Sequence, residues 1–182
     1  IIALLIASCV NKIGDEIKES NIPISFSVKT SKTTTKAAKS AFETGDRIGV
    51  FAMLTGNSLD KQRYIDNLLL ECGEGSKLIP KKEVYYPEGD ATLDFISYYP
   101  YQTASVSKGS SLLNVAVQAD QSKAADYSLS NFMTARIEDV SNSEKTVKLE
   151  YKHQFAKIKL VLTPKEGEDA DDMLLSLIHI SE

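Results

Sequence analysis

The sequence predicts an all-β protein, an antiparallel β-sandwich of about seven strands, on three observations. Apolar and polar residues alternate with a period of two along several short segments, which is the pattern of half-buried strands. The chain has no Trp and 8 Tyr, and it is rich in β-branched residues, which fit a pleated surface. Gly and Pro separate the segments at short intervals, and short strands with such turns favour two packed sheets.

The first half of the chain contains three expected strands. In Ile22–Val28, the residues Ile22, Ile24, Phe26 and Val28 alternate with polar neighbours. Residues 30–40 are rich in Thr and Lys and read as a loop or crossing segment. Residues 47–54 (RIGVFAML) form a nearly continuous apolar run, typical of a central strand.

Residues 58–72 are ambiguous, because Ile65, Leu68, Leu69 and Cys72 also fit helical spacing and Gly73 could cap a helix. The neighbouring strands favour a strand over Tyr64–Glu71. The remaining expected strands cover Glu83–Tyr86, Leu93–Tyr99, Leu112–Gln118, Lys145–Lys152 and Gln154–Thr163.

Length and charge bound the function. A chain of 182 residues suits one large domain, and a net charge of −4 gives no reason to expect nucleic acid as a partner. Cys9 and Cys72 are the only cysteines, too few for a disulfide framework, and no CxxC occurs. We therefore expect neither a zinc site nor another metal or cofactor.

The N-terminal apolar run is too short to span a membrane, which takes about 20 residues. Its length fits the core of a signal peptide, and the chain lacks an initial Met, so we expect residues 1–8 to be a lipoprotein signal truncated at its start. The motif Ile6-Ala7-Ser8-Cys9 resembles a lipobox. Cys9 would then carry the lipid, with two or three acyl chains such as palmitate, and residues 9–21 would be a tether. The alternative is a buried N-terminal strand with an inert cysteine.

The C-terminal tail raises a different question. Residues 175–182 (LSLIHISE) resemble the translation of a transposase adapter from sequencing libraries, although an alternating strand is the alternative. Such segments are set aside before fold reasoning, so we expect the native domain to cover residues 22–174 and assign no role to His179.

Catalytic motifs are lacking, and we do not expect an enzyme. Outside the tail, His153 is the only histidine, and a structural hydrogen bond is a better expectation than general-base catalysis. No GxSxG motif occurs, and no second histidine could complete a triad. The acidic run over 166–172 does not match a calcium loop. Tyr98, Tyr99 and Tyr101 could stack on sugars, but tyrosines at strand ends more often pack locally.

Four blocks of sequence resemble the fimbrillin family of Bacteroides-type bacteria, the Mfa-like and fimbrillin-A-like fimbrial lipoproteins. Thr35-Lys36-Ala37 followed by residues 42–51 (FETGDRIGVF) is similar to that family's opening block. Residues 94–101 (DFISYYPY) resemble its next block, with Ser97 where Ala is common. Asp120-Gln121-Ser122 and the stretch 147–157 resemble later blocks, in the family's order.

The resemblance implies a transthyretin-like β-sandwich, the N-terminal domain of a two-domain fimbrial subunit or anchor at the outer membrane. In that family, a protease removes the N-terminal segment, and a strand from another subunit fills the vacated groove, as in β-augmentation. The cleavage is often at Arg, but none lies between Cys9 and Asp46. Arg47 starts an expected buried strand, a poor site for cleavage. An anchor or tip protein that keeps its lipid is therefore at least as well supported as a stalk subunit.

The expected function is thus a lipid-anchored fimbrillin-like surface protein acting by strand complementation in fimbria assembly and adhesion. Its key residues would be Cys9 for the lipid and Ile22, Ile24, Phe26 and Val28 as the exchangeable strand, with other fimbrial subunits as partners. The alternative is a monomeric surface lipoprotein that binds glycans or other ligands of host or bacterial surfaces through Tyr98, Tyr99 and Tyr101.

Overall fold

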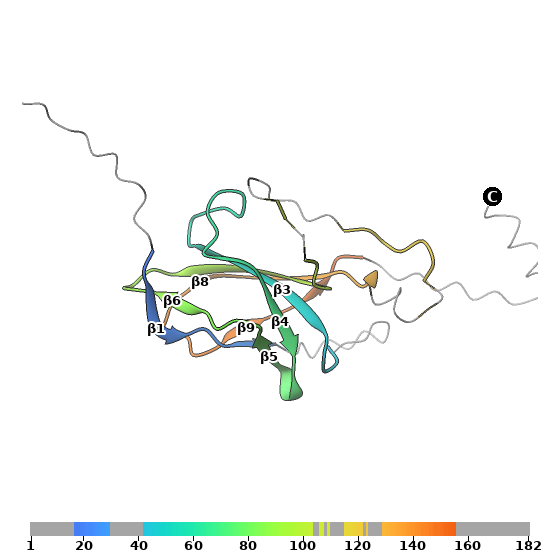
Figure 1. The fold of residues 1–182 in the computed structure, drawn as a ribbon, viewed down its shortest axis with the longest axis horizontal. Coiled ribbons are helices and arrows are strands. Elements are labelled where there is room, and N and C mark those ends of the chain that lie inside the picture. The colour runs from blue at the N-terminus through green and yellow to red at the C-terminus, as the bar shows by residue number, and fades with distance from the viewer. Residues whose placement is uncertain are drawn as a thin grey trace, which may run out of the picture.

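The computed structural model describes residues 17–29, 42–103, 106–107, 109, 115–121, 123 and 129–155. These residues form ten strands and one short 3-10 helix, which confirms the all-β class (Figure 1). The elements are β1 Glu19–Pro23, β2 Phe26–Val28, β3 Arg47–Leu54, β4 Ile65–Cys72, η1 Glu74–Ser76, β5 Lys77–Pro80, β6 Tyr85–Pro87, β7 Leu93–Tyr99, β8 Met133–Val140, β9 Val147–Leu149 and β10 Lys152–His153.

Two sheets hold these strands. Strands β1 and β6 form a two-stranded sheet, and the others form an eight-stranded sheet in the order β10-β8-β7-β3-β4-β5-β2-β9. All its ladders are antiparallel except that between β2 and β9. The two end strands, β9 and β10, are separated in the chain by only Glu150 and Tyr151. One continuous segment therefore joins the two ends of a curled sheet, and β6 and β9 lie below β8 in Figure 1.

Strand β3 lies at the centre of the molecule, as its apolar run predicted. It pairs with β4 on one side and β7 on the other. Ile48, Val50 and Ala52 face the main core, while Phe51 and Met53 lie in a second cluster with Leu59 and Tyr98. Because both faces of β3 are buried, its sequence shows no alternation.

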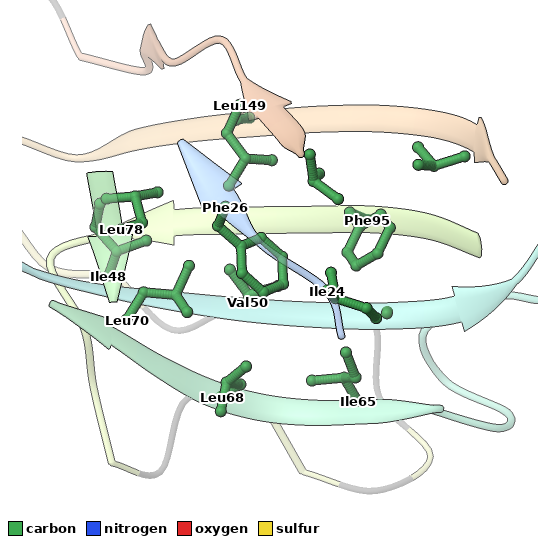
Figure 2. Packing of buried hydrophobic residues seen from close by; sticks show 14 of the residues in the cluster. Ile24, Phe26, Ile48, Val50, Ile65, Leu68, Leu70, Leu78, Phe95 and Leu149 are labelled. Atoms are coloured by element: carbon green, nitrogen blue, oxygen red, sulfur yellow. The ribbon is translucent and has the colours of Figure 1, made fainter. Parts of the chain in front are cut away.

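The main core is formed between strands that are distant in the sheet order. Figure 2 shows Phe26 of β2 and Leu149 of β9 pointing toward Val50 of β3 and Phe95 of β7. The rings of Phe26 and Phe95 pack edge to face, with centroids 5.8 Å apart. The curled sheet therefore buries its concave face against itself.

The ambiguous segment before Gly73 is a strand, as preferred, and its helical spacing has a structural cause. The register between β3 and β4 shifts between Val50 and Ala52, and Asn67 opposite this shift has φ of 48°. This is the signature of a β-bulge, which inserts one extra residue into a strand. The bulge places Ile65 and Leu68, three residues apart, in the same core and so imitates a helical repeat.

Other expected boundaries change. Ile22–Val28 is not one strand but two, β1 and β2, because they pair with different partners on either side of Ile24 and Ser25. Lys145–Lys152 divides likewise into β9 and β10. Strands β5 and β8 were not expected, and residues 115–118 form no strand. Residues 112–114 and 156–163 of two expected strands lie outside the described residues.

Candidate strand-exchange site

The predicted site residues are distributed unevenly. Ile24 and Phe26 are buried in the main core and Val28 packs against it. Ile22 is 42% exposed, so the expectation that all four side chains share one buried face is corrected. Ile22 belongs to β1, and Pro23 closes that strand before the chain turns into the core. Cys9 lies outside the described residues.

Strand β2 is held by backbone on both sides. It pairs antiparallel with β5, where Phe26 lies opposite Leu78, and parallel with β9, where Phe26 lies opposite Val147. Just beyond its ends, Val147 N donates to Ser25 O at 2.8 Å and Lys29 N donates to Leu149 O at 2.8 Å. Strand β2 thus occupies a slot between two strands that come from distant parts of the chain.

Strand β1 is attached separately, to β6. Glu19 lies opposite Pro87 and Pro23 opposite Tyr85, and Glu88 N donates to Lys18 O at 2.9 Å. The chain between the strands is also held, because Ile24 N donates to Val84 O at 2.9 Å. The N-terminal segment, residues 18–29, is therefore bound at two places in two different sheets.

One ion pair marks the end of the segment. Lys29 Nζ lies 2.7 Å from Glu150 Oε2, with the two side chains 59% and 42% exposed. The hydrogen bond from Lys29 is the main cause that lowers the pKa of the Glu150 carboxyl. Water screens a pair this exposed, so its contribution to stability is small.

Phe42 is the first residue that the structure describes after the N-terminal segment, and it packs on two tyrosines. Its ring centroid lies 5.2 Å from that of Tyr99 and 4.9 Å from that of Tyr151, both edge to face. Tyr151 is hydrogen-bonded to Ser97, and burial raises the pKa of the Tyr151 phenol. Phe42 therefore fixes the start of the following chain to β7 and to the segment between β9 and β10.

The two sequence blocks around Asp46 and Tyr99 form one unit, which sequence reasoning missed. Tyr99 OH donates to Asp46 Oδ1 at 3.1 Å, and the Arg47 guanidinium lies 5.4 Å from the centre of the Tyr101 ring. Gly49 is paired with Tyr98 across β3 and β7, and a Cβ on Gly49 would lie 2.1 Å from Tyr98 Cε1. A glycine in one block and a tyrosine in the other were the signals for this fit.

Arg47 itself is an integral part of the sheet. It is the first residue of β3, it lies opposite Glu71 of β4, and its carbonyl accepts a hydrogen bond from Tyr101 N at 2.9 Å. A protease needs the backbone around its target in an extended, unpaired form. The pairing gives a physical reason for the expectation that Arg47 is a poor cleavage site, which stays a prediction.

The tyrosine cluster is not an exposed aromatic platform. Tyr98 and Tyr99 are only 2% and 7% exposed, because their rings pack in the second cluster and in the main core. Their hydroxyl groups donate to Asn67 Oδ1 at 2.7 Å and to Asp46 Oδ1 at 3.1 Å. Tyr101 is half-buried. The geometry corresponds to local packing, the reading favoured for tyrosines at strand ends, and leaves only Tyr101 for contact with a ligand.

The remaining candidates for a catalytic or metal site are His153 and the acidic run over 166–172. His153 is exposed, and its Nδ1 lies 2.9 Å from Asn131 Oδ1, a structural hydrogen bond of the kind expected. Within the ranges that the structure describes, no three metal-binding side chains gather in one place. The same ranges contain no helix with the length and hydrophobicity needed to cross a bilayer. The acidic run over 166–172 lies outside them.

Comparison with known proteins identifies the family. The pattern of the family described as fimbrillin-like matches residues 35–181. A candidate fimbrium subunit of Bacteroides uniformis, Fim1C, is 25% identical over 134 residues, which cover 72% of this chain and 42% of that protein. The crystal structure of a candidate cell adhesion protein from the same species superposes with a TM-score of 0.51 at 18% identity, covering 72% of this chain and 49% of that one. It supports the fold alone.

The chain thus spans less than half the length of these relatives. The family match, in contrast, covers most of the chain and includes the Asp46 and Tyr99 blocks that the structure joins. The chain is a member of the fimbrillin-like family.

Proposed function

We propose that this chain is a domain of a surface fimbrial subunit, acting in adhesion, that assembles by β-strand complementation. Family membership and the similarity to a fimbrium subunit support the fimbrial role. The observation that carries the mechanism is the position of β2. It is a three-residue strand from the N-terminal segment, and it is enclosed between β5 and β9.

Removal of this strand would create a binding site for another one. The facing edges of β5 and β9 would lose their ladder partners, and unpaired edges are templates for an added strand. The places of Ile24 and Phe26 would become an apolar hole in the main core. A strand from another subunit would supply new ladder partners for β5 and β9 and would fill the apolar hole, which is the physical basis of donor-strand binding.

We also propose that Cys9 carries a lipid that holds the chain at the outer membrane. Strand β1 begins ten residues after Cys9 (19 − 9), a distance of at most roughly 35 Å in extended chain. The lipid and the N-terminal segment lie on the same side of any cut between Lys29 and Phe42. A subunit that vacates its groove would therefore also lose its anchor, whereas an uncut chain would remain in the membrane as an anchor or tip.

N-terminal sequencing of the full-length protein in purified fibres and in membranes tests strand complementation. We expect fibre subunits to begin after Lys29 and membrane-bound chains to begin at a lipidated Cys9. Fibre subunits with an intact N-terminal segment would rule out exchange at β2.

Membrane fractionation of Cys9→Ala tests the anchor. We expect this variant to leave the membrane fraction, while the matched variant Cys72→Ala, which changes a buried thiol in β4, stays in it. Unchanged membrane retention of Cys9→Ala would contradict lipid attachment at this position.

A further inference from the structure

We propose that the groove between β5 and β9 is selective and accepts strands with the pattern aliphatic–x–aromatic–x–aliphatic–cation, oriented like β2. This inference rests on the proposed strand complementation and specifies its partner. The pattern is that of residues 24–29, which the groove holds in the uncut chain.

The aromatic position is the most restrictive. Phe26 is buried and packs edge to face on Phe95, at 5.8 Å between centroids. Val50 and Leu149 line the same space (Figure 2). A smaller side chain would leave a cavity in a core that cannot fully collapse, and cavities of this kind are costly.

Alternation fixes the register of the incoming strand. Ile24 and Phe26 are buried, whereas Ser25 between them is exposed. A strand shifted by one residue would turn its polar side chains into the core and its apolar ones to solvent. The groove therefore reads the order of residues as well as their composition.

The two ladders fix the direction. The groove offers an antiparallel partner, β5, on one side and a parallel partner, β9, on the other. Hydrogen bonds are perpendicular in antiparallel ladders and slanted in parallel ladders. A reversed strand would exchange these two patterns and match neither edge.

Glu150 favours a cation at the last position of the pattern, where Lys29 lies in the uncut chain. Its carboxylate receives Lys29 at 2.7 Å, next to the hydrogen bond from Lys29 N to Leu149 O. Because both side chains are largely exposed, we expect only a few-fold preference for a cation here. The charge marks the end of the strand, whereas the apolar positions supply the affinity.

A peptide-exchange assay on the full chain tests this selectivity. A protease site is inserted within residues 30–41, the folded protein is cut, and labelled peptides with the sequence of residues 18–29 are added in excess. Replacement of the resident fragment is followed by native mass spectrometry. Four altered peptides are compared with the unaltered one: Phe26→Ala, Ser25→Ala, Lys29→Glu and an exchanged peptide that combines Ser25→Phe with Phe26→Ser.

We expect the unaltered peptide and the matched control Ser25→Ala to enter equally well. Phe26→Ala should bind roughly 100-fold more weakly, and the exchanged peptide should not enter, because it turns a serine into the core and a phenylalanine to solvent. Lys29→Glu should bind about 2- to 5-fold more weakly and should recover on a protein carrying Glu150→Lys.

The contrary outcomes separate the two proposals. If Phe26→Ala or the exchanged peptide enters as well as the unaltered peptide, the groove is not selective although exchange occurs. If even the unaltered peptide never replaces the resident fragment, strand complementation at β2 fails and the selectivity fails with it.

Discussion

Gly49 shows how a single residue decides whether two strands can approach. Tyr98 lies across the position where any other residue would carry its Cβ. The tyrosine ring stacks on Phe51, with centroids 5.9 Å apart, and its hydroxyl reaches Asn67. The glycine is therefore required by close approach, since its backbone is part of a regular ladder.

Replacing Gly49 with Ala should destabilise the domain by about 1–3 kcal/mol, because the new methyl group overlaps a buried ring. Gly73→Ala is the matched control. Its new Cβ would lie 3.0 Å from the end of the exposed Ile79 side chain, which can move away, and 3.8 Å from Lys77 O, an ordinary contact distance. We therefore expect a change within about 0.5 kcal/mol. Urea unfolding measures both, and equal stabilities would contradict the packing argument.

The buried thiol of Cys72 makes the stability of the domain sensitive to alkali. Burial is the main cause that raises the pKa of this thiol from 9.0 to about 12, and burial likewise raises the pKa of Tyr64 from 10.0 to about 12. A raised pKa in the folded state means that the unfolded state loses its proton first as pH rises. The stabilisation of the folded domain by the neutral forms of Cys72 and Tyr64 is therefore complete below pH 9 and is lost between about pH 9 and 12.

We therefore expect the free energy of unfolding to be flat from pH 7 to 8.5 and to fall above pH 9. In the Cys9→Ala background, the fall should begin about one pH unit higher when Cys72 is also replaced by Ala, since the tyrosines then titrate first. Denaturant unfolding at several pH values checks this. A stability that stays constant to pH 10.5 would show that these groups are not protected by folding.

At the scale of elements, Arg63 connects the β3–β4 link to the segment after β7. Its side chain is only 7% exposed. It donates to the carbonyl groups of Leu59, Val106 and Ser107 and lies over the ring of Phe51. The guanidinium thus satisfies several backbone acceptors that strand pairing leaves unused, a task that suits its five fixed donors.

Arg63→Ala should cost about 2–4 kcal/mol in unfolding free energy, because these carbonyl groups lose a charged donor. Arg63→Lys should recover only part of the loss, since a lysine cannot reach all the acceptors at once. Asp66→Ala is the control, because it removes only the exposed ion pair to Arg63 and should cost less than about 1 kcal/mol. Equal losses in Asp66→Ala and Arg63→Ala would place the energy in the ion pair.

The elements also show what the sequence can predict. Strands β3 and β7 were predicted with their observed bounds, since a buried run between turn signals needs no information about partners. Strand β8 was missed. Asp139, with φ of 58°, and a register shift between β7 and β8 interrupt its alternation. Such bulges depend on pairing, here on Asp94 Oδ1, which accepts a hydrogen bond from Asp139 N at 2.9 Å.

The candidate site was predictable to a similar degree. Alternation identified Ile24 and Phe26 as core residues, and both are buried. The break between β1 and β2 was not predictable, because it results from β6 and β5 lying in different sheets. The contact between Lys29 and Glu150 joins residues 121 positions apart, and no local pattern contains such a distance.

At the scale of the whole molecule, we expect the N-terminal segment to open before the rest of the domain. Strand β3 is paired on both sides and buried on both faces, whereas β1 and β2 are only five and three residues long. Regions with fewer buried contacts open with a smaller free energy.

Hydrogen–deuterium exchange with mass spectrometry checks this order. Peptides covering residues 19–29 should exchange well before peptides from β3 and β7. A segment that exchanges only with β3, in global unfolding, would show that it cannot leave the groove while the remaining domain stays folded.

The double attachment of residues 18–29 has a kinetic consequence. A segment bound at two places dissociates only when both are open at once, because the bound half keeps the other at a high effective concentration. Yet β1 and β2 belong to separate sheets, so either half can be displaced alone. An incoming strand from another subunit could first replace β1 on β6 and then replace β2 residue by residue between β5 and β9. The core would never be left empty, and the exchange would proceed without unfolding the subunit.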